Sequence, residues 1–150
     1  MSSLSLAQAS TIVDAALAKA REMSLLPMTV VVLDTGGHMV ALKREDGSGI
    51  LRVEIATGKA WGGLGIGAGS RVLADRVGTG PAGEAFVAAA AVASGGRLVP
   101  VAGGVLVRDS SGAIIGAVGV SGDLSDKDEA CALAGIAAAG LAGDTGAPKT

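Results

Sequence analysis

The chain has 150 residues, of which 49% are hydrophobic and only 1% aromatic, and its formal net charge is -2 at pH 7. This length suits a single domain whose core must be built from Ala, Val, Leu and Ile. A slightly acidic chain with almost no aromatic side chains lacks both the basic surface and the stacking platforms of nucleic-acid-binding proteins. We therefore expect no nucleic-acid partner.

The N-terminal segment and the single cysteine favour a cytoplasmic protein. The first ten residues, MSSLSLAQAS, lack the basic and apolar regions of a secretory signal, and no apolar stretch approaches the roughly 20 residues that cross a bilayer. Cys131 has no partner for an intrachain disulfide, and no repeated cysteine spacing indicates a zinc site. We predict a cytoplasmic location and no membrane partner.

The first third of the chain predicts a helix followed by a β-hairpin. Ser5 and Gln8 form a capping-box pattern, and apolar residues then recur at helical spacing as far as Met23. After Pro27, the β-rich runs MTVVVLD and HMVALKR are separated by a Thr-Gly-Gly turn sequence. The only histidine, His38, therefore begins the second strand beside a turn.

The middle of the chain predicts helices and then a second group of strands. Helical spacing extends from about residue 48 to 67, although the glycines after Trp61 should weaken it. Short helices are expected over residues 70–77 and from Pro81, which suits a first helical turn. The runs RLVPVAGGVLVRD and AIIGAVGVSG flank a Ser-Ser-Gly turn, which predicts two or three antiparallel strands.

The C-terminal part predicts one more helix and a tail. Ser125 is expected to cap a helix whose first turn is acidic, the sign that suits the positive end of the helix dipole. This helix should end near Leu141, so we predict a single domain over residues 1–142 and a flexible, frayed tail over residues 143–150. Because the strands come in hairpins rather than in βαβ units, the fold class is predicted to be α+β, an antiparallel sheet with helices packed on it.

Several segments resemble, in the same order, a known family. They are LDTGGHMVALKREDG, IATGKAW, GSRVLADR, SGGRLVPVAGGVLVRDSSGAIIGAVGVSG and DKDEACALAGIAA, and together they cover nearly the whole chain. They are similar to the GlcG/HbpS/PduO C-terminal family, often called haem-degrading. The resemblance implies a five-stranded antiparallel sheet with helices on its faces. Some members bind haem or iron, and others accompany glycolate or diol metabolism without an agreed activity.

Both the resemblance and the composition favour a second copy of the chain as the partner. Members of the family usually assemble as dimers or larger even-numbered oligomers. The segment AFVAAAAVA has small side chains that allow two helices to approach closely. We expect an even-numbered homo-oligomer.

The helix around residues 48 to 67 carries the first candidate site residues. Lys59 matches the family's KA motif, and helical spacing places it on one face with Arg52, Ile55 and Gly63. A glycine on that face would leave room for an anionic or carbonyl-bearing ligand beside the ammonium group. Trp61 stands where relatives often carry a Thr-Ala pair and could form a wall of the pocket. The alternatives are a solvated helix lysine and a tryptophan that only packs in the core or an interface.

The other candidates come from the strands and loops. Arg97, Gly103 and Gly104 match the loop-and-strand block of the family, and the resemblance places them with the second helix around a cofactor or ligand pocket. His38 could ligate haem iron or transfer protons near neutral pH, and its alternative is an exposed side chain at a strand start. We predict no metal site, because helix capping and the dipole suffice to explain the acidic residues that start the last helix, Asp126, Asp128 and Glu129.

Two functions remain open at this point. The first is a small-molecule-binding protein, for which the family offers haem or a related ligand as precedent. The second is a cofactor-independent enzyme that uses Lys59 and His38 as acid and base on a small metabolite. The composition offers little for tight haem ligation, since there is one histidine, no tyrosine, and a cysteine only within the last helix. The cofactor, if there is one, is unknown from the sequence.

Overall fold

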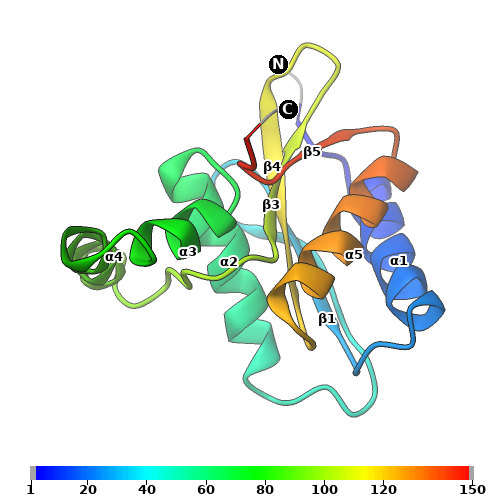
Figure 1. Cartoon of the computed structure of the whole chain (residues 1–150). Coiled ribbons are helices and arrows are strands. Elements are labelled where there is room, and N and C mark those ends of the chain that lie inside the picture. The colour runs from blue at the N-terminus through cyan, green and yellow to red at the C-terminus, as the bar shows by residue number, and fades with distance from the viewer. Residues whose placement is uncertain (1–2, 149–150) are drawn as a thin grey trace.

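A five-stranded antiparallel sheet separates two layers of helices (Figure 1). The computed structural model describes residues 3–148. Along the sheet the strands follow the order β2-β1-β4-β3-β5. Their bounds are β1 Thr29–Leu33, β2 Met39–Arg44, β3 Gly104–Arg108, β4 Ile114–Ser121 and β5 Ala142–Asp144. The predicted fold class is confirmed.

Within residues 3–148 the chain forms five helices, and they differ in how much of the sheet they cover. Their bounds are α1 Leu6–Glu22, α2 Arg52–Ile66, α3 Arg71–Val77, α4 Pro81–Ala93 and α5 Ser125–Ala138. Helices α1 and α5 pack together on one face of the sheet, and α2 covers the other face. Figure 1 shows α3 and α4, in green, extending from α2 away from the sheet. No helix in the described part of the chain is long and apolar enough to span a membrane.

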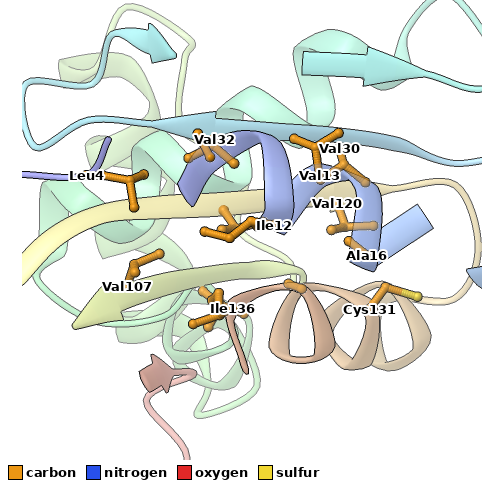
Figure 2. Packing of buried hydrophobic residues seen from close by; sticks show 14 of the residues in the cluster. Leu4, Ile12, Val13, Ala16, Val30, Val32, Val107, Val120, Cys131 and Ile136 are labelled. Carbon is orange, nitrogen blue, oxygen red and sulfur yellow. The ribbon is translucent and has the colours of Figure 1, made fainter. Parts of the chain in front are cut away.

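The sheet is buried on both faces because its central strands are apolar at successive positions. In β1, Val30 and Val32 face α1 and α5, whereas Val31 and Leu33 face α2. All four side chains are fully buried, as expected for a strand covered on both sides. Figure 2 shows the larger of these two clusters, where side chains of α1 and α5 meet those of the sheet.

Cys131 belongs to this larger cluster, as Figure 2 also shows. The thiol is free and fully buried. Burial raises the pKa of Cys131 to about 11, so the thiol stays protonated near neutral pH. A buried, protonated cysteine of this kind acts as a small apolar side chain.

Two expectations about the C-terminal part are wrong. Ser125 does not cap α5, because it is already helical and Leu124 occupies the cap position without a side-chain hydrogen bond. The frayed tail does not begin at Gly143, because Gly143 and Asp144 belong to β5, which pairs with β3. An ion pair of 2.8 Å between Arg108 and Asp144 supports this pairing. Residues 149–150 of the expected tail lie outside the described residues.

Candidate functional site

A cleft of about 500 Å³ lies on the outer side of α2. The inner side of this helix packs on the sheet through Ala56 and Ala60. Residues from the start and the outer side of α2 form one wall of the cleft, and the loop that follows α4 forms the other. The lining residues are Leu51, Val53, Glu54, Ile55, Thr57, Gly58, Trp61, Gly96, Arg97 and Val99. Its size and its mostly apolar lining are those of a small-molecule site.

The loop is held firmly against α2 at Gly58. The backbone N–H of Val99 donates a hydrogen bond of 3.2 Å to the carbonyl oxygen of Gly58. A side chain at Gly58 would collide with the side chain of Val99 and with the carbonyl oxygen of Arg97. Further along the loop, Leu98 is buried in a small cluster with Leu73. The glycine inside α2 therefore lets the loop approach and shapes the cleft.

Trp61 and Arg97 contact each other at one end of the cleft. The guanidinium carbon of Arg97 lies 4.1 Å from the centroid of a Trp61 ring, which is a cation–π contact. Nε of Arg97 donates a hydrogen bond of 3.0 Å to the carbonyl oxygen of Ser94. These two contacts fix the plane of the guanidinium group. Within residues 3–148, its two terminal nitrogens make no hydrogen bond, so they remain available to a ligand.

Lys59 points to a different place, the end of the sheet between α2 and α5. Its side chain is only 2% exposed, and Nζ donates hydrogen bonds of 2.9 Å to the carbonyl oxygen of Val120 and 3.0 Å to Oδ2 of Asp128. Burial lowers the pKa of Lys59 and raises that of Asp128, and the attraction between the two charges opposes both shifts. Paired and hydrogen-bonded in this way, Lys59 holds two layers of the fold together.

The expected open space beside Lys59 is therefore absent. A side chain at Gly63 would face the carbonyl oxygen of Ala68 and the side chain of Leu106, not the Lys59 ammonium group. The structure does not bring Lys59 to the cleft, because its ammonium group turns toward β4 and α5. Helical spacing indicates which residues lie near one another on the helix, but it does not indicate which neighbouring element covers them.

Gly103 and Gly104 lie beside Lys59 and do not line the cleft. A Cβ atom at Gly103 would be 2.8 Å from Nζ of Lys59, and one at Gly104 would collide with the Lys59 carbonyl group. The N–H of Gly104 also donates a hydrogen bond of 2.8 Å to Oγ of Ser70. These two glycines make room for α2 and the buried lysine. The structure places neither of them in the lining of the cleft beside α2.

Asp128 and Glu129 carry a role that their position in an acidic first turn does not indicate. Oδ1 of Asp128 accepts a hydrogen bond of 3.0 Å from the N–H of Asp123, and its other oxygen binds Lys59. Glu129 accepts two hydrogen bonds from Arg71, of 2.9 Å from Nε and 2.6 Å from a terminal nitrogen. The two ion pairs join α5 to α2 and α3. A lysine embedded among small, apolar residues was the signal that could have suggested a buried acidic partner.

His38 lies near Trp61 but outside the cleft. Its imidazole is 80% exposed, and Nδ1 lies 3.2 Å from Oδ1 of Asp34. The turn before it rests on the indole, since a side chain at Gly37 would come within 2.9 Å of Trp61. A smaller hollow of about 150 Å³ lies there, lined by the turn, by Trp61 and by the end of α2. Trp61 thus borders both hollows, and His38 lines neither.

Solved structures share this arrangement of helices and strands. The PduOC:haem complex has a TM-score of 0.81 and 23% identity, over 93% of this chain and 97% of that chain. The protein ORFY of Klebsiella pneumoniae has a TM-score of 0.83 and 24% identity, over 93% and 92% of the two chains. A double mutant of Streptomyces reticuli HbpS has a TM-score of 0.75 and 28% identity, over 91% and 87%.

Comparison with family models agrees with the fold. Among curated proteins no match is found. The model described as "Haem degrading protein HbpS-like" matches residues 4–137, which is most of the chain and includes both walls of the cleft. The chain therefore belongs to the HbpS-like family of haem-degrading proteins.

Proposed function

We propose that the protein binds a small organic anion with a flat, apolar body in the cleft beside α2. The observation that carries this proposal is the Arg97 guanidinium group, held on Trp61 at the end of an otherwise mostly apolar cleft. A guanidinium group fixed in one plane suits a carboxylate, because it can donate two parallel hydrogen bonds. The apolar walls and the indole would cover the body of the ligand.

Haem is the precedent within the family, and one neighbouring structure is titled as a haem complex. In the cleft, Arg97 can bind a carboxylate of such a ligand, and Trp61 offers an aromatic wall for its flat body. Among residues 3–148, the lining of the cleft includes no histidine, cysteine, methionine or tyrosine, which are the usual protein ligands of haem iron. The cleft of one chain therefore does not fit an axially ligated iron. We propose an organic anion bound through its carboxylate, without iron ligation from these residues.

The acid/base alternative has less support from the geometry. Lys59 is enclosed by its partners, and His38 is largely exposed on a turn. Neither residue lines the cleft. A general acid or base must reach the reacting group within hydrogen-bonding distance, directly or through one water. We therefore favour binding over catalysis by this pair.

We also propose that the chain self-associates through α4. This helix is apolar around most of its surface, with Glu84 as its only charged residue. Val92 is 81% exposed and Phe86 is 45% exposed. A helix that is apolar on all sides is normally buried, and α4 packs mainly on α3 within its own chain. A second copy of the chain is the partner that we propose for it.

The binding proposal is tested by titrating the protein with protoporphyrin IX and with haemin. Because the chain has a single tryptophan, its fluorescence reports directly on Trp61. We expect both compounds to quench it with similar, weak affinity, since iron gains no ligand in the cleft. Arg97→Met should weaken binding at least about tenfold, which corresponds to roughly 1.4 kcal/mol.

Arg76→Met is the matched control. Arg76 also stacks on an aromatic ring, with its guanidinium carbon 4.2 Å from the centroid of Phe86, but it lies outside the cleft. Equal affinities of the wild type and both variants would refute the proposed site. Saturation by haemin alone at a fixed stoichiometry, with a Soret band that His38→Ala shifts, would instead assign iron ligation to the histidine.

A further inference from the structure

The cleft beside α2 carries opposite charges at its two ends. Glu54 and Arg97 are the ionisable residues among those that line it, all of which belong to the described part of the chain. Arg97 is held at Trp61, and Glu54 precedes Trp61 by two turns of α2. A rise of 1.5 Å per residue separates the backbone positions of Glu54 and Trp61 along the helix axis by about 10 Å. Among the ion pairs formed within residues 3–148, none joins Glu54 to Arg97.

The space between the two charges is apolar. It is bordered by Ile55 and Val99, and by the bare backbone of Gly58. Arg97 takes its contacts within the chain from Trp61 and the carbonyl group of Ser94 rather than from Glu54. The carboxylate and the guanidinium group therefore face the same cleft without neutralising each other.

Glu54 has a simpler role that must be separated from ligand binding. It lies in the first turn of α2, where a carboxylate interacts favourably with the helix dipole. Glu84 has the same role in the first turn of α4 and is also exposed, but it does not line the cleft. Comparison of these two residues isolates the effect of facing the cleft.

We infer that the cleft selects an elongated, bipolar ligand. Its carboxylate would bind Arg97, its flat apolar body would lie along α2, and a protonated amine about 10 Å away would bind Glu54. The inference rests on the proposed binding function and adds the class of ligand to it. A dicarboxylate of the same length is disfavoured, because its second carboxylate would meet Glu54.

Three rigid probes with a common body test the inference. They are 4′-(aminomethyl)biphenyl-4-carboxylate, biphenyl-4-carboxylate and biphenyl-4,4′-dicarboxylate, titrated at low salt with Trp61 fluorescence as the readout. We expect the aminomethyl compound to bind about tenfold more tightly than the monocarboxylate, as a charge-assisted hydrogen bond allows. The dicarboxylate should bind most weakly.

Substitution of Glu54 then identifies the group responsible. In Glu54→Gln the preference for the aminomethyl compound should fall to within about twofold, while the monocarboxylate keeps its affinity. Glu84→Gln should leave all three affinities unchanged. A wild type that does not prefer the aminomethyl compound, or a Glu54→Gln variant that keeps the full preference, would overturn the inference.

A different experimental result would contradict the proposed function itself. If Arg97→Met leaves the affinity of the monocarboxylate unchanged, the carboxylate does not bind at Arg97. If no probe binds saturably to the wild type, both the binding proposal and the bipolar ligand are contradicted. Loss of the aminomethyl preference with an intact dependence on Arg97 overturns only the inference about Glu54.

Discussion

One side of α2 carries the buried ion pair of Lys59 with Asp128, and the other side lines an open cleft. The two sides differ in whether the cation found there has hydrogen-bond donors available to a ligand. Lys59 is enclosed, and both of its hydrogen bonds are made within the chain. Arg97 is exposed, and within the described residues its contacts with Trp61 and Ser94 leave its terminal nitrogens open. A cation whose partners are all internal stabilises the fold, whereas a cation that is fixed but unpaired can bind a ligand.

The largest expected effect comes from breaking the enclosed pair. Lys59→Met leaves Asp128 buried without its cation, so we expect the free energy of unfolding to fall by about 3–5 kcal/mol. Urea or thermal unfolding measures the loss. A change below about 1 kcal/mol would mean that the pair contributes little to the fold.

The next effect concerns the exposed helix α4. Val92→Glu places a charge on its outward apolar surface, and Val92 is 81% exposed in the single chain. We expect this variant to shift the assembly from an even-numbered oligomer toward the monomer, with the free energy of unfolding of the isolated chain nearly unchanged. Light scattering at micromolar concentration measures the mass. A wild type that is already monomeric would contradict self-association.

The smallest effect is expected at His38. Its contact with Asp34 is an exposed side-chain contact, and contacts of this kind typically contribute about 0–1 kcal/mol. His38→Ala should change the free energy of unfolding by no more than about 0.5 kcal/mol and the affinity for protoporphyrin IX by less than about twofold. Loss of binding in this variant, with binding retained in Arg97→Met, would give the histidine the role that we assign to Arg97.

The elements that the sequence predicted well are those with a local signal. The capping box of Ser5 and Gln8 is present at the start of α1. The β-rich runs on either side of the first turn form β1 and β2. By contrast, β5 has the composition Ala-Gly-Asp, which carries no strand signal, and it forms because β3 offers it an unpaired edge.

Only part of the candidate site could be predicted from the sequence, because its contacts also depend on how distant segments pack together. Trp61 and Arg97 were both selected, but their contact depends on how the loop after α4 folds onto Gly58. Lys59 was expected in the pocket and lies away from the cleft. Because α2 has small residues on most sides, its sequence does not distinguish the sheet side from the cleft side. The Lys59–Asp128 pair joins residues far apart in the chain, and no local pattern indicates it.

The separation of the two sides of α2 is tested most directly by a variant that removes the buried charges together. Replacement of a buried ion pair by apolar residues is often neutral or stabilising, so Lys59→Met combined with Asp128→Leu should recover most of the stability lost in Lys59→Met. The account predicts that this folded double variant binds protoporphyrin IX as the wild type does, whereas Arg97→Met folds normally and binds at least about tenfold more weakly. A folded double variant that has lost binding, beside an Arg97→Met variant that keeps it, would place the ligand at Lys59 and contradict the account.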